Sequence, residues 1–445
     1  MFNGDVGEDF SMKNYKFIVP IVLVGLFALS IYMLYDTKSS QVERYNQSLR
    51  LAREAREMDV QVDAEKYYKE ALAQTASPEL YVEIGEFYAE SGQTKKAINW
   101  GAEMLIKYPT DISGYEYMFD IHSGRKDYIS CFQLAETMRK RELVSEKVNE
   151  ILAEIEYEYF FNCEYADVGI FAGGVCPVKL EDKWGYVNVI GDKVIPNKFL
   201  KVGYHSGELA PVIDSDKDVY YIDLQGNKKL VPQDIGTMKE LGLIENGMFS
   251  MFNGKTWGFY NTDGQHVFGE YKEASSIGNG VAAVTTDGEK WSLVDRTGTD
   301  LTQKAYDGVA MDEKKVIYRN DRIFVCEDYY YKMVDLAGNY ITDTKYEDVR
   351  IFNDGTYAAV KMDGLWGFID KDGNVIIEPK YENARSFTNG LAAVQYAGKW
   401  GFIDATGKLV IETQFDDARD FTSQGSAFVQ TDGAWKLLRL YKYNY

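Results

Sequence analysis

Hydrophobic positions follow three different patterns along the 445-residue chain. After a polar tail, residues 1–16, an uninterrupted apolar run occupies residues 17–35. Residues 40–160 place apolar side chains at helical spacing, and residues 165–445 alternate short apolar runs with Gly-rich turns, as β-strands do. The pattern predicts an α+β multidomain chain with an apolar helix, a helical segment and an all-β repeat array.

The apolar run has the length of a transmembrane helix. Its 19 residues, Phe17 to Tyr35, carry no charge and would span roughly 30 Å of hydrocarbon. Tyr15, Tyr32 and Tyr35 lie near its ends, where aromatic side chains favour the membrane interface. A signal peptide would have a shorter apolar region, about 7–15 residues, followed by a small-x-small cleavage site. The sequence therefore favours an uncleaved anchor over a signal peptide.

Basic residues flank this run on both sides. Lys13 and Lys16 precede it. Five follow it: Lys38, Arg44, Arg50, Arg53 and Arg56. Counting charges alone would place the C-terminal side in the cytoplasm, but long domains translocate largely regardless of charge. Because lysines next to a single span after a short tail are the usual signal-anchor arrangement, we expect a single-pass cell-membrane protein whose C-terminal bulk is extracytoplasmic. Cytoplasmic repeats are the alternative.

The helical segment repeats a pattern of small and large residues about every 34 positions. Its clearest copy, Pro78 to Pro109, has small residues at Gly85 and Ala97 and large ones at Tyr81 and Tyr88. This copy resembles a tetratricopeptide repeat, in which small residues let the two helices of a hairpin approach closely. The resemblance covers about 100 residues and implies two or three hairpins plus a capping helix at about 144–160, a small α-solenoid. Such a stack would either bind peptides or act as a spacer.

A Trp-Gly hairpin recurs in the β array about every 35 residues. Eight units are marked by Trp184, Val219, Trp257, Trp291, Tyr331, Trp366, Trp400 and Trp435. In seven of them an Asp or Asn follows four positions later, and a Gly follows three positions after that. One such unit buries too little surface alone, so neighbouring units must stack.

Each unit contains two or three short strands. In the clearest copy these are Leu391–Val394, Trp400–Asp404 and Leu409–Ile411. The Asp side chain can hydrogen-bond into the turn that follows it, and the Gly supplies a positive φ there. The Trp recurs at one position inside an apolar strand, so we interpret it as a core residue rather than a sugar-stacking platform. The structural repeat markers are Trp184, Trp257, Trp291, Trp366, Trp400 and Trp435, with Gly185, Gly258, Gly367 and Gly401.

The repeat resembles the WG-repeat family, also called KWG repeats. The most specific matches are Lys399-Trp-Gly-Phe-Ile-Asp404 and Leu365-Trp-Gly-Phe-Ile-Asp370, and the resemblance covers about 270 residues. Trp291-Ser292 and Trp435-Lys436 depart from it because they lack the Gly. The resemblance implies a bacterial interaction or surface module and brings no catalytic residue set.

The spacing of the units leaves two architectures open. A mean interval near 36 residues is short for a four-stranded propeller blade, which in the WD type takes about 40–45 residues, so an open β-solenoid is one possibility. Seven full units and a terminal half unit instead indicate a ring closed by its two ends. We therefore favour a propeller-like array.

Charge and motif content restrict the ligand. With 69 acidic and 49 basic residues the formal net charge is −20, which argues against a nucleic-acid partner. The four cysteines form no Cys-x-x-Cys pair, and Asp370–Asn374 resembles only the start of a calcium loop, so we expect no metal and no cofactor. Cys163 and Cys176 are close enough in sequence to form a disulfide if exported, but we favour buried free thiols.

No catalytic motif is present. The sequence has no nucleotide-binding loop, nucleophile elbow or zinc-protease signature, and no carboxylate pair is singled out by its context. We therefore expect a protein that is not an enzyme. A propeller-type hydrolase is a less favoured alternative, because it would need a carboxylate pair at one mouth of the ring.

These expectations combine into a non-catalytic, membrane-anchored scaffold that presents its array to a protein partner, at the bacterial cell surface. A cell-wall carbohydrate-binding protein is the alternative, in which exposed tyrosines such as Tyr329 and Tyr330 would contact the sugar. We expect recognition to lie in variable loops such as Asp312–Asn320, where the repeat pattern is weakest.

Overall fold

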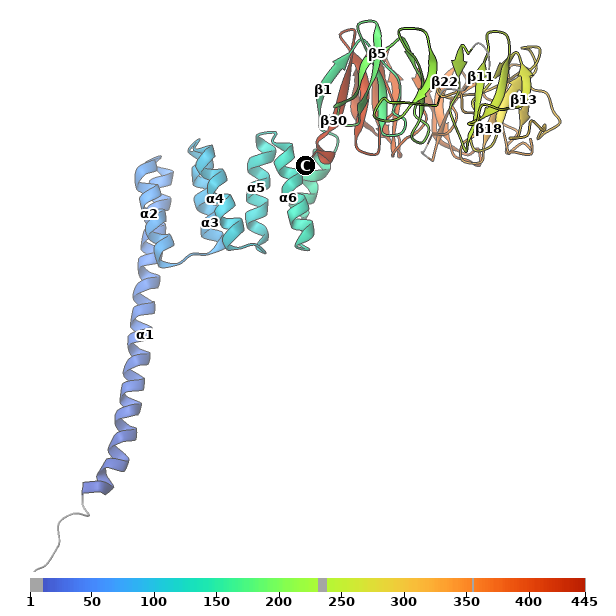
Figure 1. Ribbon diagram of the computed structural model, residues 1–445. Helices are drawn as coiled ribbons and strands as arrows, with labels where there is room; N and C mark the ends of the chain where they lie inside the picture. The colour runs from blue at the N-terminus through green and yellow to red at the C-terminus, as the bar shows by residue number, and fades with distance from the viewer. Residues whose placement is uncertain (1–10, 231–237, 354–355, 445) are drawn as a thin grey trace, which may run out of the picture. The chain divides into compact units, whose positions relative to one another are not determined.

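The computed structural model describes residues 11–230, 238–353 and 356–444, and of residues 11–21 only the backbone (Figure 1). Residues 1–10 of the predicted tail lie outside the described residues. The chain divides into two compact units, Met1–Ile155 and Glu156–Tyr445. The first unit is helical and the second is built of β-strands.

The helical unit begins with one long helix, α1 (Ser11–Glu57), which contains the whole apolar run and continues beyond it. Its apolar side chains from Val22 to Tyr35 are exposed, for example Phe27 at 69%. By length and composition this helix could cross a membrane, and a signal sequence near an N-terminus would pass the same test.

Six shorter helices follow α1 and pack mainly against their neighbours in sequence. They are α2 (Gln61–Gln74), α3 (Pro78–Glu90), α4 (Thr94–Lys107), α5 (Ile112–Gly124), α6 (Tyr128–Lys140) and α7 (Glu146–Glu154). Four of them begin where a Ser or Asp side chain accepts a backbone N–H of the first turn, which satisfies an otherwise unpaired donor. The last helix is shorter than the expected capping helix, because the residues after Glu154 leave the helix and enter a strand.

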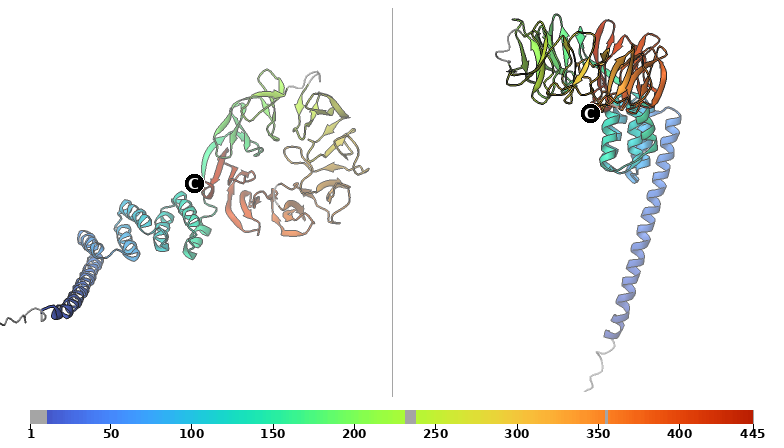
Figure 2. Two further views of the ribbon diagram at one scale, coloured as in Figure 1. Left: turned by 60° about the horizontal axis from the view of Figure 1, so that its bottom comes forward. Right: turned by 90° about the vertical axis from the view of Figure 1, so that its right-hand side faces the viewer.

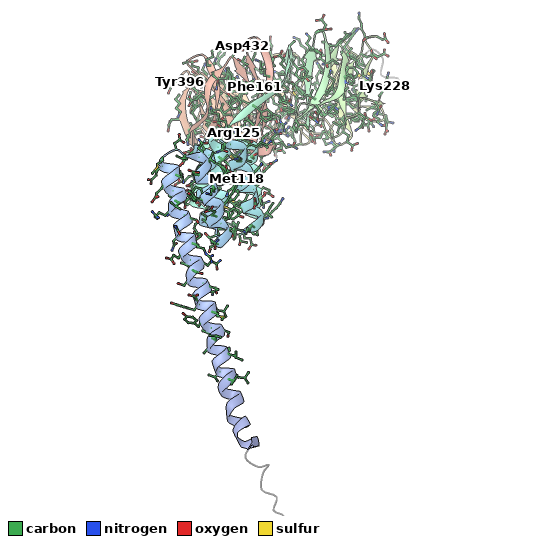
Figure 3. All side chains as sticks on the ribbon, turned by 90° about the vertical axis from the view of Figure 1, so that its left-hand side faces the viewer. Met118, Arg125, Phe161, Lys228, Tyr396 and Asp432 are labelled. Atoms are coloured by element: carbon green, nitrogen blue, oxygen red, sulfur yellow. The ribbon has the colours of Figure 1, made fainter. Side chains whose placement is uncertain are left out.

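Small residues set the distance between the helical hairpins. A side chain at Gly85 would overlap the ring of Tyr117, and one at Gly101 would overlap the side chain of Met118, which is labelled in Figure 3. Ala97 is fully buried beside them. The recurring small residues are therefore the contact positions between α3, α4 and α5.

The second unit is a closed ring of eight β-sheets, an eight-bladed β-propeller (Figure 2). Blades 1 to 4 are β2 (Asp167–Val168), β3 (Val175–Leu180), β4 (Lys183–Asn188) and β5 (Lys193–Phe199); β6 (Lys201–Val202), β7 (Ala210–Ile213), β8 (Val219–Ile222) and β9 (Lys228–Leu230); β10 (Glu240–Leu241), β11 (Met248–Phe252), β12 (Trp257–Asn261) and β13 (His266–Tyr271); and β14 (Glu273–Ala274), β15 (Ala282–Thr285) and β16 (Ser292–Val294).

The remaining blades complete the ring. Blades 5 to 8 are β17 (Gly308–Val309), β18 (Ile323–Glu327) and β19 (Tyr330–Val334); β20 (Asp348–Val349), β21 (Ala358–Met362), β22 (Leu365–Ile369) and β23 (Val375–Tyr381); β24 (Asn383–Ala384), β25 (Leu391–Tyr396), β26 (Lys399–Asp404) and β27 (Leu409–Phe415); and β28 (Asp417–Ala418), β29 (Ser426–Thr431) and β30 (Ala434–Leu440) with β1 (Tyr159–Tyr165). A short 3₁₀ turn, Tyr441–Tyr443, follows β30.

The ring is closed by pairing its first strand with its last. In blade 8, β1 runs antiparallel to β30, with Tyr159 opposite Leu440 and Tyr165 opposite Trp435. The closed ring confirms the propeller-like prediction, and the open-solenoid alternative is wrong. The propeller also begins before the predicted start at residue 165, because β1 belongs to the last blade and has no Trp-Gly pair of its own.

The Gly of the Trp-Gly pair lies where the fourth strand of a blade approaches the third. A Cβ atom built at Gly401 would lie 2.5 Å from the carbonyl oxygen of Ile411, and one at Gly367 would lie 2.6 Å from that of Ile377. In both blades the pairing register shifts at this point, so the fourth strand bulges over the glycine. Gly185 meets Ile195 in the same way.

Four units lack this Gly and have a side chain in its place: Tyr220 in blade 2, Ser292 in blade 4, Lys332 in blade 5 and Lys436 in blade 8. Blade 2 keeps a short fourth strand, β9, and in blades 4 and 5 the chain folds back through isolated bridges such as Trp291 with Tyr306. Blade 8 takes β1 as its outer strand, where Lys436 is paired with Glu164. The long fourth strand that bulges within its own repeat accompanies the Gly in blades 1, 3, 6 and 7.

The repeated Trp side chains pack inside the blades. Trp257, Trp366, Trp400 and Trp435 are buried, whereas Trp184 and Trp291 are half-buried. Four of the six propeller tryptophans therefore belong to the hydrophobic core, and the other two lie at its margin.

The Asp and Gly that recur at fixed spacing in the repeats form the turn after the strand that carries the Trp. Asp370 Oδ1 accepts the N–H groups of Asp372 and Asn374, each at 2.9 Å, and Gly373 has a φ of +84°. The same pair of hydrogen bonds recurs at Asn188, Asp223, Asp295, Asp335 and Asp404. The carboxylate that resembled a calcium ligand thus organises its own turn.

Replacing Gly401 with Ser tests the close approach of the fourth strand. The new side chain would meet the backbone at Ile411, so we expect the free energy of unfolding to fall by at least about 2 kcal/mol. The measurement is denaturant unfolding of the full chain in detergent. Ser292→Ala is the matched control at the same repeat position and should change stability by less than about 0.5 kcal/mol. Equal losses in both variants would contradict the explanation.

Replacing Trp400 with Ala tests the role of the repeated Trp in the core. Loss of this buried side chain should destabilise the propeller by about 3–5 kcal/mol. Trp184→Ala should cost less, because Trp184 is only half-buried. Thermal unfolding followed by circular dichroism would show the difference. An unchanged melting temperature for Trp400→Ala would rule out the core role.

Candidate binding surfaces of the propeller

The short first strands of the blades surround the central channel of the ring. A cavity of about 450 Å³ is lined by residues from seven of the eight blades, most of them between the first and second strands of a blade. Examples are Ile170 in blade 1, His205 in blade 2, Asn353 in blade 6 and Phe421 in blade 8. Contact with blades all around the ring places this cavity on its axis.

Three arginines occupy one repeat position in blades 6, 7 and 8, directly after the first strand. Their guanidinium carbons lie 4.6 Å, 6.0 Å and 4.6 Å from the ring centroids of their own blades' tryptophans: Arg350 over Trp366, Arg385 over Trp400 and Arg419 over Trp435. Cation–π contacts of this kind hold the cation against the aromatic face. Blades 1 to 5 have Gly, Ser or Ala at this position. At this repeat position the channel wall therefore has a cation in blades 6 to 8 only.

The loop Asp312–Asn320, between β17 and β18, contacts three other blades around the channel. In blade 4, Ser276 donates its N–H to the Lys315 carbonyl and its hydroxyl to the Lys314 carbonyl, both at 2.9 Å. The Lys315 ammonium lies 4.6 Å from the Trp257 ring of blade 3. The segment that the sequence singled out for recognition thus lies within the channel of the ring.

The same loop reaches the arginine side of the channel. Glu313 accepts a hydrogen bond from Arg385 Nη1 of blade 7 at 2.9 Å. Asp312 Oδ1 holds the loop turn by accepting the N–H groups of Lys314 and Val316, at 2.9 and 2.8 Å. Recognition by this loop stays a prediction. Any ligand that the loop binds would contact it in the channel.

Loop residues line two cavities in the channel. Lys314 and Val316 line the cavity of about 450 Å³, which we call the first cavity. Asp312 and Glu313 line a second cavity of about 690 Å³, together with residues of blades 6, 7 and 8. Because consecutive loop residues face different cavities, the loop separates them.

Arg385 connects the parts of the chain that line the second cavity. Its Nε donates to the Ala418 carbonyl at 2.7 Å, Nη1 donates to Glu313, and Nη2 lies 3.9 Å from Asp417 Oδ1. One guanidinium therefore joins the loop of blade 5 to blades 7 and 8, and its charge is matched by two carboxylates.

Asp420 lines both cavities and is held among polar groups. Burial raises the pKa of its carboxyl to about 6, against the opposing effect of Arg385. Its Oδ2 accepts a hydrogen bond from Asn353 Nδ2 at 3.1 Å, and its Oδ1 is buried without a partner among the described residues.

The three histidines do not come together. His205 is 3% exposed, and burial lowers its pKa, so it is neutral beside the Tyr186 ring. His122 pairs with Asp127, and His266 lies at a hairpin in blade 3. Across the part of the chain that the structure describes, no group of three His, Cys, Asp or Glu side chains could hold a metal ion.

Cys163 and Cys176 are unbonded, as are Cys131 and Cys326. Cys176 lies in the hydrophobic core of blade 1, and burial raises its pKa well above the usual value for a thiol. Cys163 packs against the same core cluster from β1. Both side chains serve as small apolar residues at the seam where the ring closes.

The hairpin tip of blade 5 is unusual for this array. Asp328 and Tyr329 connect β18 to β19 with φ values of +50° and +70°, and Tyr329 is 93% exposed. The second tip position is Gly in blades 6, 7 and 8, at Gly364, Gly398 and Gly433. The sequence indicated that Tyr329 is exposed, but only the backbone shows that this residue replaces a left-handed glycine.

Comparisons with known proteins concern the repeat and the ring. The family model "WG containing repeat" matches residues 147–184, 257–291, 333–366, 366–400 and 400–435. No curated protein matches the sequence.

Similar solved structures include the C-terminal WD40 domain of Sif2, with 8% identity, a TM-score of 0.41 and coverage of 63% of this chain and 98% of that one. BamB from Moraxella catarrhalis has 14% identity, a TM-score of 0.33 and coverage of 62% and 86%. Hsv2p of Kluyveromyces lactis has 10% identity, a TM-score of 0.38 and coverage of 55% and 93%.

The family matches fall on the Trp-marked blades and begin at the segment that leads into the closing strand. Three of the five run without a break across blades 6, 7 and 8, where the Trp-Gly spacing is most regular. The chain contains WG repeats within an eight-bladed β-propeller, which follows an N-terminal helical region.

Proposed function

We propose that this protein is a non-catalytic scaffold, anchored in the bacterial cell membrane by α1, that presents its propeller to a protein partner at the cell surface. The observation that carries the proposal is Tyr329, a large aromatic side chain held in solvent on a strained backbone.

Folding alone does not account for Tyr329. A left-handed conformation costs an L-residue about 1–2 kcal/mol relative to Gly, which the neighbouring blades use at this position. The side chain does not offset this cost by packing in the core, because it is 93% exposed. Backbone strain that packing does not explain is typical of functional positions. Tyrosine is also among the residues enriched at the centres of protein interfaces.

Two further tyrosines extend this surface, and we call the three the tyrosine patch: Tyr329, Tyr330 and Tyr340. Tyr330 is 43% exposed and Tyr340 is 44% exposed. Glu327, which pairs with Tyr330 across the hairpin, accepts the Tyr340 hydroxyl at 2.8 Å. The patch is thus a fixed group of rings on one blade, which suits a protein surface of matching shape.

The anchor part of the proposal rests on α1. Its apolar residues from Val22 to Tyr35 have no protein partner within the described chain, so water would contact them unless a membrane covered them. The tetratricopeptide-like hairpins then serve as a stalk. Lys13 and Lys16 beside the span support the outward orientation, as does the tendency of long domains to translocate largely regardless of charge.

The carboxylates of the channel favour binding over catalysis. Asp420 has the raised pKa that a general acid needs, but Oδ1 is buried and Oδ2 is engaged by Asn353. Glu313 and Asp417 both face the Arg385 guanidinium, which keeps them as ion-pair partners. We therefore propose a structural role for this network.

Carbohydrate binding is the second candidate function. The exposed rings of Tyr329 and Tyr330 favour it, because they would be free to contact a sugar. Retention on isolated wall polysaccharide, compared between the native protein and Tyr329→Gly, would separate a sugar bound at the tyrosine patch from a protein partner.

Tyr329→Gly should have opposite effects on stability and binding. Removing the left-handed tyrosine should raise the free energy of unfolding by about 1 kcal/mol, while contact with the partner is lost. Thermal unfolding gives the first result. Site-specific photo-crosslinking in intact cells gives the second, with the crosslinker placed at position 330, next to Tyr329 in one protein and to the new Gly in the other.

Tyr396 supplies the matched control. It is also exposed beside a hairpin tip, in blade 7, and is labelled in Figure 3. A crosslinker at 330 should give a discrete higher-mass product, and one at 396 should not. Equal products at both positions, or none at 330, would contradict docking at the tyrosine patch.

Protease treatment of intact cells tests the orientation. If the propeller is extracytoplasmic, protease added outside should remove an epitope placed after Tyr443 while a cytoplasmic marker protein survives. Lysed cells show that the epitope can be cleaved. Survival of the epitope in intact cells would place the repeats in the cytoplasm.

A further inference from the structure

The second cavity has a wall with a defined chemical character. Its volume of about 690 Å³ is in the range of small-molecule sites, roughly 300–1,000 Å³. The wall is formed by blades 6, 7 and 8 and by Asp312 and Glu313 of the loop Asp312–Asn320, which we call the channel loop. The tyrosine patch is not part of it.

The charges around this cavity are already matched in pairs. Glu313 and Asp417 share Arg385, and Asp416 pairs with Lys399 at 2.6 Å. The carboxylate of Asp312 lies 3.7 Å from the Lys314 ammonium, and Arg350 lies 3.5 Å from Asp348. Asp420 lies near Arg385 and Arg419. A charged ligand would have to break one of these pairs or face an uncompensated repulsion.

Apart from Asp420 Oδ1, which is buried without a partner among the described residues, the side-chain groups that we find free at this wall are neutral amides. Gln395 and Gln430 line the cavity, and neither side chain has a hydrogen-bond partner in residues 11–230, 238–353 and 356–444. Asn383 uses its Oδ1 to accept the Ala384 N–H, and its amino group is free within the same ranges. Each amide group has two donors and one acceptor oxygen, so the three together offer both kinds of hydrogen-bonding group.

The amides are arranged in rows by the strand register. In blade 7, Asn383 lies opposite Gln395, and Gln395 lies opposite Trp400, so the three lie side by side across three strands. In blade 8, Asp417, Gln430 and Trp435 form the same row. In the other blades the position of these glutamines holds Lys179, Ile213, Phe252, Thr285, Cys326 and Lys361. The glutamines are thus a feature of blades 7 and 8 alone.

We propose that the second cavity binds a neutral oligosaccharide, held by the amides of Asn383, Gln395 and Gln430. Hydroxyl groups both donate and accept, so a sugar can pair with these amides without disturbing the ion pairs around them. An apolar ligand would leave the amides desolvated and unpaired. This inference does not depend on a protein partner at the tyrosine patch.

Binding of neutral trisaccharides to the full chain tests the inference. The protein is solubilised in lauryldimethylamine oxide, which carries no sugar, and is titrated with cellotriose, maltotriose and triacetylchitotriose in a calorimeter. Trialanine with an acetylated N-terminus and an amidated C-terminus serves as the neutral peptide probe. We expect at least one trisaccharide to bind with a Kd on the order of 1 mM or tighter, and trialanine to bind at least tenfold more weakly.

The variant Gln395→Leu/Gln430→Leu should weaken that binding at least tenfold. Lys361→Leu is the matched control at the same position of blade 6, outside the cavity wall, and should leave the Kd unchanged. Gln395→Glu keeps the size of the side chain and serves as a second variant if the double leucine variant does not fold. It should also weaken binding, since it adds an unmatched charge.

Three results would overturn the proposal. The first is that none of the trisaccharides binds. The second is that the peptide probe binds as well as or better than all of them. The third is that the glutamine variants bind the trisaccharide as tightly as the native protein does. Loss of partner crosslinking at position 330 with normal saccharide binding would reject the proposed function while leaving this inference intact.

Discussion

The contact between the Gly of each Trp-Gly pair and the bulged strand folded over it determines how a blade is built. At Gly185, Gly367 and Gly401 no side chain larger than hydrogen fits beneath the carbonyl groups of the fourth strand. With that strand in place, the adjacent Trp is covered on its outer side. In blades 6 to 8 an arginine at the channel covers it from the inner side. Blade 3 obtains its covering cation from Lys315 of the channel loop instead. A short apolar repeat thereby forms a core in which most Trp side chains meet a cation.

Structural features formed by residues close together in sequence were predictable, because all the residues that form them lie within one repeat. The Asp-to-Gly spacing predicts the turn at Asp370–Asn374, and the hydrogen bonds of that turn join residues two and four positions apart. The eight repeat units, six of them marked by a Trp, predict eight blades. The half unit at the end predicts that another strand must complete it, as β1 does.

Features that join distant segments were not predictable in the same way. The strand β1 has no Trp-Gly pair, and its partner is more than 250 residues away, so the sequence of Tyr159–Tyr165 does not indicate which strand it pairs with. The path of Asp312–Asn320 depends on Ser276 and Arg385, which belong to other repeats. The arginine row did have a signal, since Arg350, Arg385 and Arg419 recur 35 and 34 residues apart. This spacing indicates that the three arginines occupy the same position of the repeat. It does not indicate which of them lie in one cavity with the glutamines of blades 7 and 8.

Closure by β1 and β30 has a consequence for biosynthesis. The first strand of the propeller cannot pair until residues 434–440 have been made, about 270 residues later. At usual elongation rates of about 5–20 residues per second, β1 waits on the order of tens of seconds as an unpaired, aromatic-rich edge. Such a high contact order slows folding and leaves the nascent chain open to association with other chains. The ring therefore forms late and as a whole, and a chain that stalls within blade 8 has no substitute for the missing strand.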